Sequence, residues 1–462
     1  MKTLCKLTIF LFCTGCALGP NFCRPVVTTP SDWQVAELNE EPPQMWWTLF
    51  GDPLLSELIE ESIACNFDSQ IATVRIKRAR AARKEALSAA WPHIGLDFDA
   101  ARFHLSDDFP LLTTSSAFNV FDASFDAHWE IDLFGKAKRG SEAVEAAFAA
   151  EIERKRATTL TLIAEVARAY NDLRRVQGQI LLLEESLEIE RSLLEATKLQ
   201  QKEQLIGSQR ALQIKQQMHT QQEQLIALRA FERLAKNGLA YLVTGLPGSL
   251  DERLSCYTPL HPFSHPLAVG LPSTLLCRRP DVRAAEQALA IKTAQVGLSM
   301  SDFFPKFDLL ADVGYLSQKI SQLFQNQSYT ALYNFFTRWP IFEGGRLLAR
   351  FKIAKAEQQE ALLEYCKIAL FAFHDVDNAL ISYQSKQEQL CQVEESLRDN
   401  QILLENSEAL YREQFAPKSA IDQAILSSLE VKTRLIDARA ALFEQYIVLY
   451  KALGGGWECF DH

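Results

Sequence analysis

The sequence between residues 121 and 133 alternates strictly between apolar and polar side chains, and this alternation limits what the chain can fold into. One set of positions holds Phe121, Ala123, Phe125, Ala127, Trp129, Ile131 and Leu133, and the set between them holds Asp122, Ser124, Asp126, His128, Glu130 and Asp132. Because successive side chains of a β-strand point to opposite faces, such a strand has one apolar and one polar face. The pattern predicts a strand that lies between an apolar medium and water.

Two classes of protein contain strands of this type. A strand of a soluble sandwich alternates with its polar residues turned toward water. A strand of a transmembrane barrel needs about 10 residues, with apolar side chains toward lipid and polar side chains toward the lumen. A soluble sandwich would need many such strands, whereas here very long helical segments flank each pair of strands. The pattern therefore favours a transmembrane barrel.

The same order of elements occurs twice along the chain, which is a repeat of one structural unit. A helical pattern that ends at Pro92 precedes the first pair of strands, and a helical pattern that ends at Pro305 precedes the second. Pro92 and Pro305 are 213 residues apart, and Trp129 and Trp339, near the ends of the two returning strands, are 210 residues apart. The chain is therefore expected to contain two copies of helix, β-hairpin, long helix, turn and helix.

Long helical segments follow both hairpins. Apolar residues recur every seven positions, at Val166, Leu173, Ile180, Leu187 and Leu194 in the first repeat and at Val376, Tyr383, Leu390, Leu397, Leu404 and Tyr411 in the second. A seven-residue repeat indicates a coiled-coil seam. The first segment turns near Gly207 and the second near Pro417, and each returns as a second helix.

The repeat and its flanking segments divide the chain into six regions. These are a signal peptide (1–15), a lipid-anchored extension (16–44), repeat 1 (45–245) with strands at about 94–105 and 118–133, a connector (246–271), repeat 2 (272–454) with strands at about 306–316 and 329–342, and a C-terminal tail (455–462).

Four membrane strands cannot close a barrel, and an open edge in lipid leaves backbone groups unpaired at several kcal/mol each. The chain is therefore expected to assemble with copies of itself. Two copies give eight strands around an interior filled by side chains, and three give twelve strands with room for a lumen. The acids expected to face that wet lumen are Asp122, Asp126, Asp132 and Asp312.

The N-terminus is typical of an exported protein. Lys2 and Lys6 precede a short apolar stretch and then the small residues before Cys16, which is the organisation of a secretory signal. Residues 13–16 resemble a bacterial lipobox, which implies that Cys16 becomes the first residue and carries lipid. A plain cleaved signal with an unmodified cysteine is the alternative. Acyl chains can hold a protein on a membrane, because each buried CH₂ contributes about 0.8 kcal/mol.

Composition argues against several other functions. Lys plus Arg number 48 and Asp plus Glu 58, a net charge of -10, which disfavours nucleic acid as a partner. His261 and His265 have no third ligand nearby, so we expect no metal site, and apart from Cys13 and Cys16 in the lipobox-like segment the cysteines form no CxxC pair. We find no constellation for catalysis and expect neither an enzyme nor a cofactor.

Four segments carry a resemblance to a known family, namely residues 46–53, 129–135, 270–281 with Arg278-Arg279-Pro280-Asp281, and 450–457 with its Leu-Gly-Gly-Gly-Trp end. They resemble the outer-membrane efflux channels, TolC-like and closest to the lipoprotein branch (OprM-like, NodT type). The resemblance implies a mainly α-helical chain with a transmembrane β-barrel portion, and a homotrimer with a twelve-stranded β-barrel and a periplasmic α-helical barrel. It implies a periplasmic adaptor protein and an inner-membrane transporter as partners.

The resemblance also implies a gate at the periplasmic helix tips. Arg412 and Asp422 flank the second tip, and an aspartate from each subunit would form a ring that favours cations. The tip departs from the family pattern, because the usual glycine is absent and Pro417 is present. An exposed charged turn without a gating role is the alternative.

The resemblance implies that the protein is a passive exit duct for small molecules. We expect it in the outer membrane, because Ala17 after the cysteine lacks the Asp that commonly retains bacterial lipoproteins at the inner membrane. Two alternatives stay open. One is a periplasmic coiled-coil scaffolding lipoprotein without conductance, and the other is the exit duct of a type I protein secretion system. The resemblance implies that substrate choice resides mainly in the inner-membrane partner.

Overall fold

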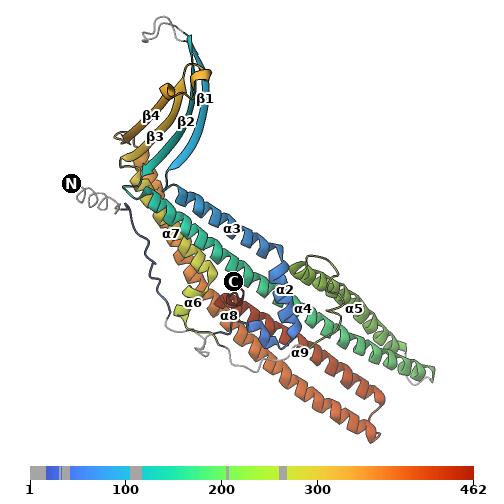
Figure 1. Cartoon of the computed structure of the whole chain (residues 1–462). Coiled ribbons are helices and arrows are strands. Elements are labelled where there is room, and N and C mark those ends of the chain that lie inside the picture. Colours follow the sequence, from blue (N-terminus) through green and yellow to red (C-terminus); the bar gives the residue numbers. More distant parts are fainter. Residues whose placement is uncertain are drawn as a thin grey trace. The chain divides into compact units, whose positions relative to one another are not determined.

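The computed structural model describes residues 17–30, 33, 42–104, 117–203, 208–259 and 268–461 (Figure 1). The elements follow in the order η1 (Trp46–Phe50), α2 (Pro53–Cys65), α3 (Phe67–Ser88), β1 (His93–His104), β2 (Ala117–Ile131), α4 (Lys136–Lys202), α5 (Ser208–Val243), α6 (Pro272–Arg278), α7 (Pro280–Ser301), β3 (Lys306–Ser317), η2 (Ile320–Gln322), η3 (Asn326–Ser328), β4 (Tyr329–Arg338), α8 (Arg346–Arg412), α9 (Lys418–Leu453) and η4 (Glu458–Phe460). Helix, hairpin, long helix and returning helix thus occur twice, as the repeat predicts.

The chain forms two compact units, and both repeats contribute to each. One unit comprises Met1–Val26, Arg75–Ile152 and Ala284–Cys366, and it contains the whole sheet. The other comprises Val27–Val74, Glu153–Arg283 and Lys367–His462 and is helical. We refer to them as the sheet unit and the helical unit. Each compact unit therefore contains segments of both sequence repeats. The regions expected at 45–245 and 272–454 correspond to the two sequence repeats and not to the two compact units.

The sheet unit contains one four-stranded antiparallel sheet in the order β1-β2-β3-β4, which Figure 1 shows side by side. β2 ends at Ile131 and β4 at Arg338, earlier than the expected limits of 133 and 342. Pro340 has no N–H to donate to a neighbouring strand, and Ile341 continues the apolar positions of β4 after the backbone pairing has ended. The loop between β1 and β2 lies outside the described residues.

The two repeats contain helices of equal length. α4 and α8 have 67 residues each, and α5 and α9 have 36 each. In the helical unit most heptad residues of α4 are buried, with Val166 and Leu173 fully covered and Leu187 2 % exposed, whereas Leu194 is half-buried. None of the described helices carries an apolar stretch long enough to cross a lipid bilayer.

The helical pattern that ends at Pro92 is not one helix, because the chain breaks at Asn66 between α2 and α3. Asn66 has an extended backbone (φ -64°, ψ 134°), and its side-chain Oδ1 accepts the N–H of Asp68 at 2.8 Å. Its Nδ2 donates to the carbonyl of Leu242 at 3.0 Å, near the end of α5. Asn66 thus caps α3, as asparagine commonly does, while it fastens α5.

Aromatic side chains form the core of the helical unit. Trp46, Trp47 and Phe50 of η1 are buried, and the ring of Trp46 stacks on Tyr450 of α9 at 5.7 Å between centroids. Phe50 stacks on Phe443 of α9 at 4.7 Å. Such pairs contribute about 0.5–1.5 kcal/mol beyond the area that they bury. The cluster explains why the segment before α2 is aromatic.

Candidate functional site

The sheet has one face that is almost entirely apolar across all four strands. Directly paired residues of an antiparallel sheet lie on the same face, so Ile94, Ala127, Ala311 and Tyr333 form one row, and Leu96, Phe125, Val313 and Ala331 form the next. Large side chains of this face are open to the surroundings: Phe125 is 60 % exposed and Tyr333 74 %. A contiguous exposed apolar face of this kind marks a surface that contacts lipid or protein.

The opposite face carries the acids that the sequence singles out. Asp126 of β2 is the direct register partner of Asp312 of β3. The Ser124 hydroxyl, which is 2 % exposed, donates to the Asp312 carboxylate at 3.0 Å and lies 3.5 Å from that of Asp122. Gly314 permits this approach, because a Cβ at that position would lie 2.6 Å from the Ser124 Cβ. Three of the four acids therefore lie close together on one polar face.

The fourth acid, Asp132, lies one residue beyond the end of β2. Its carboxylate accepts the backbone N–H of Lys138 at 2.9 Å, in the first turn of α4. A carboxylate at a helix N-terminus satisfies a free N–H and interacts favourably with the helix dipole. The structure thus gives Asp132 a capping contact at the junction of strand and helix.

The end of each returning strand is hydrogen-bonded to the turn that follows the preceding helix, and in the same way in both repeats. The indole N–H of Trp129 donates to the Ala90 carbonyl at 3.1 Å, and that of Trp339 donates to the Phe303 carbonyl, also at 3.1 Å. Trp129 is 36 % exposed and Trp339 60 %. An amphipathic ring with a bonded N–H and an exposed apolar body suits the boundary between lipid and water.

The sheet is open at both edges in a single chain. Within the described residues β1 pairs with β2 alone and β4 pairs with β3 alone. Each edge therefore presents unpaired backbone N–H and C=O groups, which are a template for pairing with another strand. The site is incomplete in one copy of the chain.

The two expected gate residues lie at the turn between α8 and α9 in the helical unit. Arg412 ends α8 and pairs with Glu408 one turn earlier at 3.4 Å, with 73 % of its side chain exposed. Asp422, in the second turn of α9, is 8 % exposed. None of the ion pairs in the described part of the chain joins these two residues. Phe415 between them is 81 % exposed.

Motif residues 278–281 and 454–457 meet in the helical unit. Arg279 donates to Asp375 at 2.9 Å, to Asp281 at 2.8 Å and to the Ala452 carbonyl near the end of α9 at 2.9 Å. These carboxylates hold the pKa of the Arg279 guanidinium above its usual value, although burial opposes them. The adjacent Gly454 has φ 73°, and a Cβ there would lie 3.0 Å from the Arg279 Cα. The motif is therefore a joint between helices.

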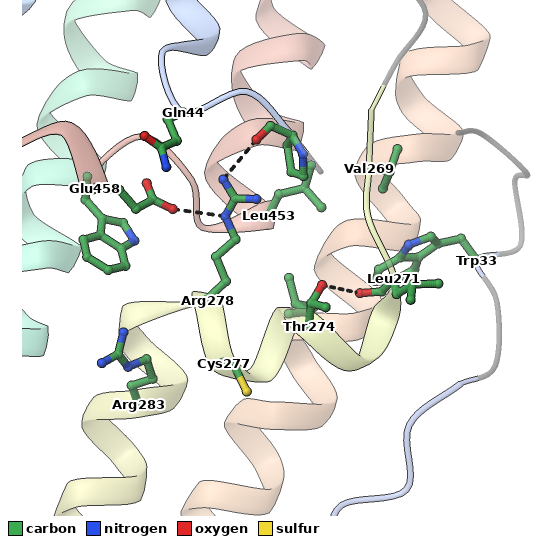
Figure 2. Close-up of a pocket in the computed structure, with 13 residues that line it drawn as sticks. Trp33, Gln44, Val269, Leu271, Thr274, Cys277, Arg278, Arg283, Leu453 and Glu458 are labelled. Carbon is green, nitrogen blue, oxygen red and sulfur yellow. Dashed lines mark hydrogen bonds and ion pairs between the residues drawn. The ribbon is translucent and has the colours of Figure 1, made fainter. Parts of the chain in front are cut away.

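A cavity of about 320 Å³ lies beside this joint (Figure 2). In Figure 2 Arg278 points toward Glu458, and its Nε lies 3.2 Å from the carboxylate. Arg278 also donates to the Pro42 carbonyl at 3.3 Å, and Arg283 pairs with Glu153 at 2.7 Å. Both arginines that line the cavity therefore already pair with residues of this chain. No group of three or more metal-ligating side chains occurs among the described residues.

Sequence reasoning missed Arg139, which holds residues 18–21 within the sheet unit. Its buried guanidinium donates to the carbonyls of Leu18 at 2.8 Å and Gly19 at 3.0 Å, and to Asn21 at 2.9 Å. Arg139 lies in the first turn of α4, four residues after Gly135, and no local sequence signal marks it for burial. Cys16, His261 and His265 lie outside the described residues.

Comparison with known proteins places these features among membrane channels. The model of a family described as outer membrane efflux protein matches residues 58–244 and 271–455. The cation efflux system protein CusC of Escherichia coli O6:H1 is 29 % identical over 98 % of this chain and 99 % of its own length. The toluene efflux pump outer membrane protein TtgC of Pseudomonas putida is 27 % identical over 99 % and 96 %. The structure of the outer-membrane channel OprN has a TM-score of 0.87 and 26 % identity, and it covers 96 % of this chain and 100 % of its own.

Proposed function

The chain belongs to the outer membrane efflux protein family, and we propose that it is the outer-membrane channel of a tripartite efflux system, a passive exit duct for small molecules. The observation that carries the proposal is the two-faced sheet, with an exposed apolar face, an acidic polar face and two open edges. Lipid is the medium that such a face requires, and water in a lumen is the medium that the acids require.

Energetics support closure by copies of the same chain. An unpaired backbone group in lipid costs several kcal/mol, so a four-stranded sheet with two free edges is not a stable membrane structure. Three copies would give a closed barrel of twelve strands with space for a lumen. The polar face would then turn Asp122, Asp126 and Asp312 inward. We propose a homotrimer on this ground and on family membership.

The helical hairpins α4–α5 and α8–α9 would form the periplasmic part of the duct, an α-helical barrel built by three copies. Their heptad residues are buried from Val166 to Leu187 in α4 and from Val376 to Leu390 in α8, and this packing supports such a tube. A periplasmic adaptor protein and an inner-membrane transporter would engage the duct, and energy for transport would come from that transporter. The relatives named above are parts of efflux systems, which supports these partners.

We propose that the mature protein is anchored in the outer membrane by lipid on Cys16. Arg139 fixes residues 18–21, so the chain directly after this cysteine is already bound to the sheet unit. Labelled palmitate should enter the wild-type protein and not a Cys16→Ser variant. Equal labelling of the two proteins would refute lipidation at this residue.

The gate proposal concerns Arg412 and Asp422 at the α8–α9 turn. A ring of three Asp422 carboxylates would attract cations and restrict the pore. Asp422→Ala is then expected to raise single-channel conductance in planar bilayers, with Glu413→Ala in the same turn as the control. Unchanged conductance and unchanged opening would remove Asp422 from the gate.

The proposed function is tested with the purified full-length protein. A channel should migrate as a heat-sensitive trimer on gels and conduct ions in planar bilayers. A periplasmic scaffold would give oligomers without conductance. Deletion of the gene should also sensitise cells to small toxic compounds that the partner transporter exports, and loss of secretion of a protein instead would indicate type I secretion.

A further inference from the structure

We infer that β4 of one copy pairs with β1 of the next in one defined register, which sets Arg338 opposite the neighbouring copy's Asp97. This inference rests on the proposed trimeric channel and names how its subunits join. It derives from the internal repeat, because the chain contains the same kind of seam between its own two hairpins. Five observations support it.

The two hairpins are structurally equivalent under fixed shifts in residue number. β1 (His93–His104) and β3 (Lys306–Ser317) have 12 residues each and differ by 213 at both ends. The tryptophan hydrogen bonds give the shift for the returning strands. Trp129 donates to Ala90, and Trp339 donates to Phe303. The two tryptophans are 210 residues apart, and the two acceptors are 213 residues apart. Position n of β1 therefore corresponds to n + 213 of β3, and position n of β2 to n + 210 of β4.

The strand registers within the two hairpins obey the same shifts. His93 pairs with His128 in the first hairpin, and Lys306 pairs with Arg338 in the second. Adding 213 to the first residue and 210 to the second converts one pair into the other. The two hairpins are thus one arrangement built twice.

The seam between the hairpins, where β2 pairs with β3, is a template for the seam between subunits. His128 of β2 pairs with Leu310 of β3 at this internal seam. The equivalent residue of His128 in β4 is Arg338, and the equivalent of Leu310 in β1 is Asp97. Repetition of the internal seam between subunits therefore places Arg338 directly opposite the neighbouring copy's Asp97.

The side-chain faces agree with this register. Arg338 shares the face of its partner Lys306, and Asp97 shares the face of its partner Ser124, which is the polar face in both cases. Phe335 and Thr337 then meet the neighbouring copy's Ala100 and Phe98 on the apolar face. A slip by one residue would place apolar side chains opposite polar ones along the whole seam.

Charges at the two open edges are complementary in this register. Arg338 faces Lys306 inside its own chain, a like charge that lies 3.7 Å from Asp302. Asp97 is exposed and faces Ser124. Within the described residues neither Asp97 nor Arg338 has an ion-pair partner. Opposite charges directly across two strands attract, whereas like charges repel. The carboxylate of the neighbouring copy would offset the Arg338–Lys306 repulsion.

Cysteine cross-linking tests the register in the full-length trimer. Directly paired residues have Cα atoms within disulfide reach, whereas β1 and β4 of one chain are separated by about 14 Å, so a bond can form only between chains. The variant carrying Asp97→Cys and Arg338→Cys should give a covalent trimer that survives heating without reductant and is lost with reductant. Each single variant controls for bonds to the native cysteines.

The matched control carries Asp97→Cys with Phe336→Cys, which is on the same face of β4 two residues away. This pair should give no covalent trimer. A covalent trimer from the control pair, with none from the Arg338 pair, would overturn the register and leave the trimeric channel standing. Absence of any trimer or conductance in the wild-type protein would instead refute the proposed function.

Charge exchange tests the ion pair separately. Asp97→Arg alone and Arg338→Asp alone should each lower the temperature at which the trimer dissociates on gels. The double exchange should restore that temperature toward the wild-type value, which a purely structural role of either residue would not produce. Equal effects of the singles and the double would overturn the pairing.

Discussion

Replacement of Glu190 by glutamine is expected to stabilise the packing of α4 against α5 at neutral pH. Glu190 is 1 % exposed and lies beside a buried apolar cluster that includes Leu187 and Met218. Its Oε1 accepts one hydrogen bond, from Gln221 Nε2 at 2.9 Å, and its Oε2 has no partner. A buried carboxylate with one unpaired oxygen is costly in its charged form.

The magnitude follows from the pKa. Burial raises the pKa of Glu190 from 4.5 to about 6, and the Gln221 hydrogen bond only partly opposes this effect. The difference of about 1.5 pKa units corresponds to about 2 kcal/mol, since one unit is about 1.36 kcal/mol. Glutamine is uncharged at every pH and keeps the acceptor for Gln221, so Glu190→Gln should recover up to about 2 kcal/mol.

The sign of the pH dependence is fixed by the raised pKa. Below pH 4.5 the carboxyl is protonated in the folded and the unfolded chain, so the stability of the folded state carries no penalty from a buried charge. As the pH rises through about 6, the folded state must accept the charge and stability falls. The advantage of the variant should therefore be large at pH 7.5 and small near pH 4.

Hydrogen exchange of the α4–α5 hairpin measures this effect locally, without requiring the whole trimer to unfold. Peptides around residues 186–194 and 214–225 should exchange up to about 30-fold more slowly in Glu190→Gln than in the wild type at pH 7.5. Glu195→Gln, on an exposed position of the same helix, is the control and should change little. Equal or faster exchange in Glu190→Gln at pH 7.5 would refute the reasoning.

Four further predictions concern the joint and the sheet. Arg279→Met should destabilise the helical unit by about 3 kcal/mol in denaturant titrations, because two carboxylates and the Ala452 carbonyl lose their partner. Gly454→Ala should cost roughly 1–2 kcal/mol in the same assay, because φ at this position is 73°. Phe125→Arg should reduce the trimer recovered from outer membranes, at about 2–4 kcal/mol per charge in lipid. Asp126→Asn on the opposite face should leave that yield unchanged and lower cation selectivity in bilayers.

The sheet follows from the sequence because its signals are local. Period-two alternation marks the strands, and Pro92 and Pro305 mark where the preceding helical patterns stop. The expected strand ends are wrong where the side-chain alternation continues beyond the backbone pairing. Asp132 still fits the alternation, although β2 ends at Ile131. Alternation reports which face a side chain would occupy, and not whether its peptide group finds a partner.

Long-range features could not be derived in this way. The Asn66 break depends on a hydrogen bond to Leu242, which is 176 residues away. Arg279 and Arg139 carry no local signal for burial, because arginine is usually exposed and each is buried only by its partners. Arg412 and Asp422 are close in sequence, but α8 and α9 set their surroundings, and the part they play in gating stays a prediction.

The two tryptophan attachments have a consequence for how such a protein can evolve. Trp129 and Trp339 fasten two separately encoded hairpins by the same bond. In a ring of three chains, hairpins of the first repeat alternate with hairpins of the second. A mutation in one repeat therefore alters every second tryptophan hydrogen bond around the ring and leaves the ones between them unchanged. One hairpin can then acquire new side chains that face the lumen, while the other hairpin keeps the residues that stabilise the barrel.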